Sequence, residues 1–230
     1  SYFSPKSAED FNMSMTVTAI TMRRNAVFIS VISQVTPSES STLKKVAYEP
    51  LFLGHLKKTF NIKGIKRVVM HEPLTNIRKV IFLQFDRSVP QTEVWRGLQA
   101  AASLQAQCGK VVIAVSEDID PNNADAIFWS VAYRSNISTD VHVTPYRSGG
   151  HGPKSGRSGT DATLMIDATL KADMPPLALP RKEFMGRAKV IWEELQLPRL
   201  TPQPPWHGYE LEDWSEHWTD YAKRAVDGDW

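Results

Sequence analysis

The sequence predicts an α/β (α+β) fold, in which a mixed sheet is flanked by helices. Helical and strand-like segments alternate between about residues 40 and 145, in the order helix, two strands, helix, strand, helix, strand. The run KVVIAV at 110–115 is almost continuously apolar, as in a strand covered on both faces. The 230 residues are 42% hydrophobic and 23% charged, so the chain can bury a substantial core.

The first elements follow from local sequence. Ser38 opens a predicted helix over residues 38–60, in which apolar residues recur near helical spacing and Pro50 is expected to kink or break the chain. Those apolar residues are Leu43, Val46, Ala47, Leu51 and Leu56. The short apolar runs IKRVVM (65–70) and RKVIFLQF (78–85) are typical of two adjacent strands.

The later elements and the N-terminal region are predicted in the same way. Alanine, leucine and glutamine content indicates a helix over residues 89–107. Residues 122–134 are expected to form a third helix, and DVHVTP (140–145) another strand. Residues 12–21 and 26–32 are rich in apolar and β-branched side chains, which predicts a hairpin before the main body.

The C-terminal region has a different composition. Residues 146–162 are loop-like, with five glycines and a proline. Two tail helices are predicted at 181–195 and 209–226, separated by a proline-rich stretch. Trp214 and Trp218 are four residues apart and would share one helix face, which favours packing against another subunit.

Composition narrows the class of protein. The formal net charge is +2, from 27 basic and 25 acidic residues, so no concentrated basic surface for nucleic acid is expected. No apolar run approaches the roughly 20 residues that span a bilayer, so no membrane partner is expected either. A single cysteine fits a reducing compartment, and the prediction is a cytoplasmic protein. The first residue is not methionine, so we expect either a processed chain or a piece of something longer.

An acidic cluster follows the KVVIAV run. Its members are Glu117, Asp118, Asp120 and Asp125. A calcium loop of the EF-hand type starting at Asp118 would need glycine at the sixth position and glutamate at the twelfth, where Asn123 and Trp129 stand. The cluster is therefore interpreted as a turn, with Asp120 or Asn122 as the N-cap of the following helix.

The glycine-rich loop does not match a known phosphate motif. A P-loop requires glycine before Lys-Ser, and Lys154 follows Pro153. Two readings stay open: a basic loop that closes over an anionic ligand with His151, Lys154 and Arg157, or a surface loop without a ligand. The histidines show no spacing typical of a zinc site.

The order of these motifs resembles the C-terminal part of the UbiD family of reversible aromatic and α,β-unsaturated acid decarboxylases. The stretches that carry the resemblance are VTAITMRRNAVFISV (17–31), KVVIAVSEDIDPNNADAIFWSVAYR (110–134) with Trp129 and Arg134, Asp140, and MIDAT (165–169). Ala26 stands where the family usually has proline, and Met165 where it has glycine.

The resemblance implies an architecture. Residues 1–38 would be the last strands of a split, flavin-binding β-barrel, and 39–175 the C-terminal oligomerisation domain. Residues 176–230 would be a proline-rich and helical tail at a subunit contact. The implied partners are a second copy of the chain, as a dimer or larger homo-oligomer, and the flavin-binding part of the same enzyme. The acidic turn would be a structural part of this domain, without a role as a metal site or in catalysis.

The resemblance also implies a chemistry. Family members decarboxylate aromatic, heteroaromatic or α,β-unsaturated carboxylic acids with prenylated FMN, held through a divalent metal (Mn²⁺ or Mg²⁺) and K⁺. The cofactor supplies an electron sink that protein side chains lack. The Glu-Arg-Glu proton-transfer network and the metal ligands would lie before residue 1, so no catalytic residue and no metal ligand is assigned to this chain. An alternative is an accessory or dimerisation subunit that completes a partner's active site.

What the resemblance assigns to this chain is a contribution to the substrate pocket. The matching stretches are TPSES (36–40) and TPYRSGGHG (144–152). The pocket residues expected from them are Thr36, Pro37, Thr144, Pro145, Tyr146 and His151.

Overall fold

The computed structural model describes residues 14–31, 37–71, 78–106, 108–148, 160–172, 174–175, 180, 182–198 and 216–229. Its elements, in chain order, are α2 (Glu39–Lys58), β1 (Ile65–Met70), β2 (Val80–Phe85), α4 (Gln91–Ser103), β3 (Val111–Ser116), α5 (Ala124–Arg134), β4 (Val141–Ser148), β5 (Thr160–Ala168), α6 (Lys182–Glu194) and α7 (Glu216–Asp227). The predicted alternation of helices and strands is confirmed.

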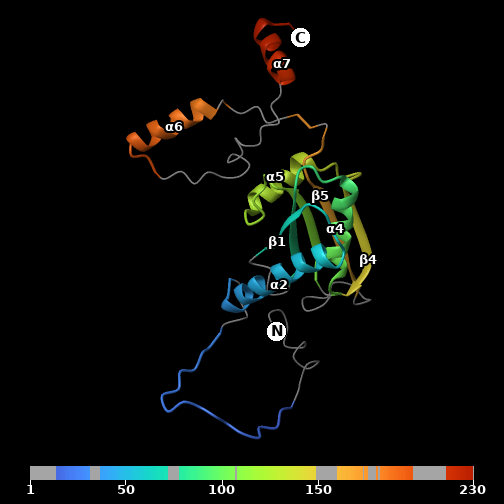
Figure 1. Ribbon diagram of the computed structural model, residues 1–230, viewed down its shortest axis with the longest axis vertical. Coiled ribbons are helices and arrows are strands. Elements are labelled where there is room, and N and C mark those ends of the chain that lie inside the picture. The colour runs from blue at the N-terminus through green and yellow to red at the C-terminus, as the bar shows by residue number, and fades with distance from the viewer. Residues whose placement is uncertain are drawn as a thin grey trace.

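The strands form one mixed sheet in the order β1-β2-β3-β5-β4 (Figure 1). The three central strands, β2, β3 and β5, are parallel. The two edge strands, β1 and β4, pair antiparallel with their neighbours. The α/β class with a mixed sheet and flanking helices is therefore confirmed.

Alternating side chains of the central strands enter two separate cores. On one face, Leu83 and Ala114 pack with Leu98 of α4 and with Phe52 and Leu56 of α2, all fully buried. On the other face, buried side chains of the same strands pack against α5. They are Phe82, Ile113, Val115 and Ile166, with Ala126 and Ile127 from the helix. The KVVIAV run is thus apolar because both of its faces are covered.

The segment TLMIDAT (163–169) lies mostly in a central strand of the sheet, a position that its sequence does not indicate. It belongs to β5, which lies between β3 and β4 although the predicted α/β body ended near residue 145. Thr163 and Asp167 interrupt its apolar run, and both are nevertheless buried. Their polar atoms are satisfied locally, since Thr163 donates to the Gly109 carbonyl and Asp167 accepts from Thr169.

Helix α2 begins at a capping box and continues through Pro50. The Ser38 hydroxyl accepts from the Ser41 backbone N–H, and the Ser41 hydroxyl accepts from the Ser38 N–H. Of the kink or break expected at Pro50, the break is wrong, because the helix continues to Lys58. A mid-helix proline costs about 3 kcal/mol, and burial of Phe52 and Leu56 just beyond it opposes that cost.

The apolar stripe that predicted α2 is not the face that buries it. Of the five residues in the stripe, only Leu56 is buried, whereas Leu43, Val46 and Leu51 are at least half exposed. The helix contacts β1 and α4 through a different face. Sequence spacing identified a helix, and tertiary contact selected the buried side.

The predicted hairpin before α2 is wrong. Residues 14–31 contain no strand, and every side chain in that segment is exposed. A two-stranded ribbon without a third strand or a helix to cover it is marginal in water. Apolar residues of this segment therefore face outward, with Phe28 exposed by 92%.

The tail contains the two predicted helices, α6 and α7, drawn apart from the sheet in Figure 1. No described residue of α7 is buried. The expected start of α7 at residue 209 lies outside the described residues, as does Trp214. None of the helices in the described part of the chain is both long and apolar enough to cross a membrane.

Gly97 allows α4 to approach the sheet closely. A Cβ atom at this position would lie 2.6 Å from Cζ of Phe85. We therefore expect Gly97→Ala to lower the free energy of unfolding by about 1–3 kcal/mol through overpacking, although alanine favours a helix by up to about 1 kcal/mol over glycine. Urea denaturation measures the change.

Gly186→Ala in α6 is the matched control, because nothing lies within 4 Å of the Cβ it would add. It should be neutral or stabilising. A Gly97→Ala variant as stable as the Gly186→Ala variant would show that Phe85 moves aside without loss.

Candidate functional site

The acidic turn after β3 holds a buried ion pair. Asp118 accepts two hydrogen bonds from Arg134, at 3.0 Å and 2.5 Å, and the exposed fractions of the two side chains are 0% and 4%. The Arg134 guanidinium also lies 5.2 Å from the centre of the Trp129 ring. This pair joins the turn to the last residue of α5, which supports the architectural reading of the turn.

The other acidic residues of the turn serve local structure. Asn123, rather than Asp120 or Asn122, is the N-cap of α5, and its side chain accepts from the Asp125 and Ala126 N–H groups. Asp120 instead accepts from the Asn122 backbone, which closes a side-chain turn. Among the residues that the structure describes, no group of three or more potential metal ligands occurs, here or elsewhere.

A second charged cluster lies near the carboxyl end of β5. Lys171 Nζ is 3.4 Å from Asp140 Oδ2 and 3.3 Å from Asp167 Oδ1. Gln91 Nε2, from the start of α4, lies 3.3 Å from a carboxylate oxygen of each aspartate. Asp140 and the MIDAT segment, which were separate motifs in the sequence, are thereby joined around one lysine.

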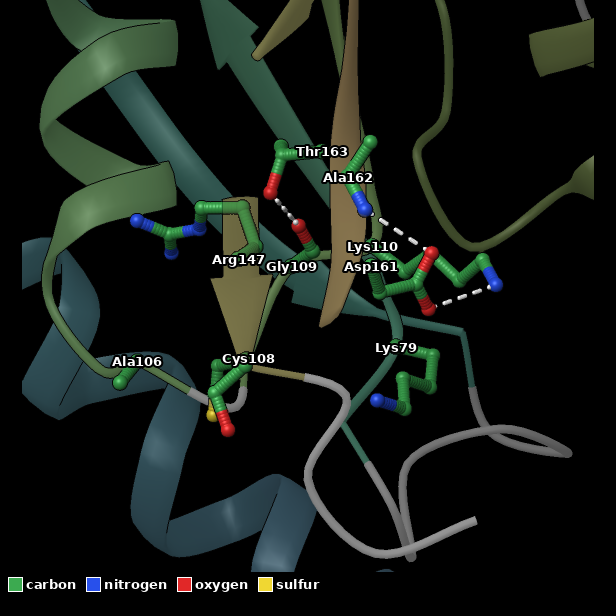
Figure 2. A pocket seen from close by; sticks show the side chains of 10 residues that line it. Lys79, Ala106, Cys108, Gly109, Lys110, Arg147, Asp161, Ala162 and Thr163 are labelled. Carbon is green, nitrogen blue, oxygen red and sulfur yellow. Dashed lines mark hydrogen bonds and ion pairs between the residues drawn. The ribbon is translucent and has the colours of Figure 1, made fainter. Parts of the chain in front are cut away.

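The opposite, amino end of the parallel strands has a small open depression, with a cavity volume of about 10 Å³. Its lining is basic: Lys79 precedes β2, Lys110 precedes β3, and Arg147 lies near the end of β4. Asp161 is the one acidic side chain in that lining. Figure 2 shows Lys79, Lys110 and Asp161 around it, with the Cys108 side chain below Gly109.

Hydrogen bonds order the rim of the depression. Lys110 Nζ donates to Asp161 Oδ2 at 2.8 Å, and the Ala162 N–H donates to the same carboxylate. These two bonds hold the pKa of Asp161 below its ordinary value. Burial lowers the pKa of Lys79, an effect that Asp161 opposes and Lys110 reinforces. Burial raises the pKa of the Cys108 thiol. The positive charges of Arg78, Lys79 and Arg147 oppose this upward shift.

A β-bulge directs Arg147 toward α4. The register of β4 against β5 shifts between Thr144 and Arg147, where one extra residue is accommodated. Tyr146, within this bulge, has φ of +60°, in the left-handed region that side chains other than glycine seldom adopt. Beyond it, Arg147 donates to the Ala102 and Gln105 carbonyls, which satisfies the end of α4.

The sequence-predicted pocket residues lie in two places. Thr144, Pro145 and Tyr146 belong to the edge strand β4, directly before the arginine that lines the depression. Pro37 precedes α2, the helix that packs against β1 at the other edge of the sheet. Thr36 and His151 lie outside the described residues, as do Lys154 and Arg157. The shared pocket therefore stays a prediction.

Sequence reasoning missed the basic lining of the depression. A signal was present, since Lys79 and Lys110 each directly precede a strand of the parallel sheet. The amino ends of parallel strands meet at one edge, so these lysines had to be neighbours. Using that signal would have required a prediction that β2 and β3 are neighbours in the sheet.

Comparison with known proteins identifies the fold. The family described as 3-octaprenyl-4-hydroxybenzoate carboxy-lyase C-terminal domain matches residues 41–168, from α2 to the end of β5. The chain belongs to the UbiD family. The predicted resemblance is thus confirmed, and the matched region contains both cores, the Asp118–Arg134 pair and the two aspartates that Lys171 joins.

UbiD relatives of known activity are longer than this chain. It is 28% identical over 193 residues to a gallate decarboxylase of Lactiplantibacillus plantarum, an alignment that covers 77% of this chain and 37% of that protein. The UbiD-class enzyme HmfF from Pelotomaculum thermopropionicum, solved with FMN, superposes with a TM-score of 0.54 at 19% identity, over 65% of this chain and 34% of its own.

A vanillic acid decarboxylase of Sedimentibacter hydroxybenzoicus gives a TM-score of 0.55 at 18% identity, over 76% of this chain and 38% of its own. The chain thus spans little more than a third of these relatives. At such identities the structural matches show a shared fold.

The described residues do not fit the flavin that the family binds. Ligand pockets for molecules of drug size enclose about 300–1,000 Å³, and the depression, with a cavity volume of about 10 Å³, is far smaller. A Mg²⁺ or Mn²⁺ ion needs several oxygen ligands, and the described residues include no group of three or more potential metal ligands. No step of a flavin reaction is assigned to a residue of this chain.

The Asp118–Arg134 pair should contribute strongly to stability. We expect Arg134→Met to lower the free energy of unfolding by about 3–5 kcal/mol, because the Asp118 carboxylate would stay buried without a partner. The double variant Arg134→Met/Asp118→Leu should recover part of that loss, since it removes both charges. Chemical denaturation of the three proteins measures both effects.

Lys66→Met is the control, because Lys66 pairs with Asp86 and Glu117 at a half-exposed site. Its effect should stay within about 1 kcal/mol, as for surface ion pairs in general. Equal effects of Lys66→Met and Arg134→Met would contradict the larger contribution to stability that we expect from the buried pair.

Proposed function

We propose that this chain is the C-terminal part of a reversible, non-oxidative decarboxylase of aromatic, heteroaromatic or α,β-unsaturated carboxylic acids. The observation that carries the proposal is the family match over residues 41–168. The 28% identity to a gallate decarboxylase supports an aromatic acid as substrate. In the proposed enzyme, prenylated FMN with a divalent metal and K⁺ is held by a region outside this chain.

The described residues would then support the reaction without performing it. The Glu-Arg-Glu proton-transfer network belongs, in this proposal, to the same outside region as the flavin. The two charged clusters would help to hold the sheet and α5 together, and the edge strand β4 would present Thr144, Pro145 and Tyr146 toward the substrate. Tyr146 suits that role, because its side chain is 87% exposed on a bulge.

The segment before α2 supports the existence of a covering region. Val27, Phe28 and Ile29 are consecutive apolar residues with exposed fractions of 88%, 92% and 81%. A run of large exposed apolar side chains is a feature of interaction surfaces. In the proposed enzyme these residues pair with the flavin-binding barrel. In the alternative, an accessory subunit, they pair with a partner chain that carries the active site.

Activity of the longest natural polypeptide that contains this sequence tests the proposal. That polypeptide, loaded with prenylated FMN, Mn²⁺ and K⁺, should release carbon dioxide from at least one acid in a panel of gallic, protocatechuic, vanillic and furoic acids. The 230-residue chain under the same conditions should be inactive. Absorbance of the aromatic acid measures turnover.

The natural polypeptide also separates the two versions of the proposal. A mass well above 25.9 kDa with activity in one chain supports the fragment reading. A mass near 25.9 kDa, with activity only after a partner copurifies, supports the accessory subunit. Activity of neither preparation toward any acid in the panel would reject the decarboxylase assignment.

Helix α7 offers a surface for self-association. His217, Trp218 and Tyr221 form an aromatic cluster in which Trp218 is partly exposed and the other two are exposed, with ring centres between 4.8 Å and 6.0 Å apart. Aromatic residues of this kind are enriched at the centres of protein interfaces. We propose that α7 contributes to a homo-oligomer of the enzyme.

Trp218→Ser/Tyr221→Ser should therefore shift the sedimentation profile toward monomer, because it removes the apolar centre of the contact. Lys223→Ala on the same helix, whose side chain is 71% exposed, is the control and should leave the profile unchanged. An oligomer that survives the double substitution would place the subunit contact elsewhere.

A further inference from the structure

Two helices of this chain each present an apolar stripe to water. Both stripes consist of residues that recur three or four positions apart, so each lies on one side of its helix. The outward stripe of α2 is Leu43, Val46, Ala47, Pro50, Leu51 and the half-buried Gly54. The stripe of α6 is Phe184, Ala188, Ile191 and Leu195, all exposed. Continuous apolar surfaces of this kind are a feature of interaction sites.

Helix α6 needs a packing partner to be stable. It has 13 residues, and isolated helices shorter than about 12–15 residues are marginal in water. Gly186, in its interior, lowers its helix propensity further. None of the described side chains of α6 is buried, and Figure 1 shows the helix away from the sheet. Its apolar stripe is therefore the surface through which it would be stabilised.

We propose that α6 of one copy of this chain packs in parallel on the outward stripe of α2 in a second copy. The two stripes have equal lengths, since residues 43–54 and residues 184–195 each cover about three helical turns. Apolar residues at alternating spacings of three and four are the pattern of helices that pack side by side. In a parallel alignment Ala47 would lie beside Ala188, and two small side chains let the helices approach closely.

Charge favours the parallel direction. In this alignment Leu195 would lie beside Gly54, where nothing occurs within 4 Å of an added Cβ atom. Glu194 directly precedes Leu195, and Lys58 follows Gly54 by one turn, so these two exposed side chains would pair at the edge of the contact. In the reversed alignment Glu194 would lie beside Val46, and Lys58 would lie beyond the start of α6.

The position of α2 favours a second copy over the same chain. The Ile62 N–H donates to the Leu56 carbonyl, and β1 begins beside the end of β2, so α2 ends at the carboxyl end of the sheet. The chain leaves β5 at the same end. To reach the start of α2 within one chain, residues 169–181 would have to run back along a helix of about 30 Å. Two copies that exchange tails avoid this path.

The inference rests on the proposed homo-oligomer, and it names a contact for it. Helix α7 follows α6 in the same tail, so one tail would supply both helices to the partner copy.

Disulfide trapping in the longest natural polypeptide that contains this sequence tests the contact. Ala47→Cys and Ala188→Cys are made in separate preparations, which are then mixed and oxidised. We expect a covalent dimer linked between positions 47 and 188, identified by mass spectrometry of the linked peptides. Lys189→Cys replaces Ala188→Cys in the control. Its position is exposed and outside the stripe, so it should link roughly tenfold less, because disulfides need close Cβ atoms.

Sedimentation of a charged variant gives an independent measurement. Val46→Asp/Leu51→Asp should raise the dissociation constant of the oligomer roughly tenfold or more, because it places two charges in an apolar contact. Thr42→Asp, exposed on the same helix but outside the stripe, is the control and should leave the constant unchanged. All three positions are exposed, so folding should be kept, and thermal unfolding verifies it.

The outcomes separate this contact from the proposed function. The expected cross-link, with weaker association of Val46→Asp/Leu51→Asp, supports the contact. A chain with both Ala47→Cys and Ala188→Cys that forms only an internal disulfide overturns it, because its own tail would then cover α2. Equal linking of the Lys189→Cys control also overturns it.

An oligomer without the cross-link and with unchanged association overturns this contact alone, and would place another part of the enzyme against α2. A monomeric polypeptide overturns both the contact and the proposed homo-oligomer. In either case the carbon dioxide assay still decides the decarboxylase assignment by itself.

Discussion

Burial of both faces of the three parallel strands is the constraint on which this structure depends. Because β2, β3 and β5 are covered on both sides, α4 and α2 must pack on one face and α5 on the other. Side chains alternate between the two cores along each strand, so a one-residue slip in register would exchange both sets of contacts. The antiparallel strands β1 and β4 form the two edges of the sheet.

The same arrangement sorts charged groups between the two ends of the sheet. At the carboxyl ends, Asp118 is neutralised by Arg134, and Asp140 and Asp167 share Lys171. Such pairs resist disruption because removing one partner leaves an uncompensated charge in a dry environment. At the amino ends, a small depression is lined by three basic side chains and one carboxylate. These are Lys79, Lys110, Arg147 and Asp161.

Membership of the UbiD family places this domain in a larger context. The 193 aligned residues are 37% of the gallate decarboxylase, which is therefore roughly twice as long as this chain, and the exposed apolar segment before α2 is a surface that such a protein can cover. The outward stripe of α2, with Leu43, Val46 and Leu51, continues that surface in sequence. Exposed apolar residues that follow one another along the chain are a feature of interaction surfaces.

The sequence by itself determined the order of elements and the class of fold, because those depend on local periodicity and capping. It also marked the acidic turn as structural, since the spacing from Asp118 excludes a calcium loop. Only the tertiary structure decided which face of α2 is buried and that β5 is a central strand. It alone brought Lys79, Lys110 and Arg147 to one depression. The physical reason is that these outcomes depend on contacts between different elements, which are set by sheet order and register and leave no local pattern in the sequence.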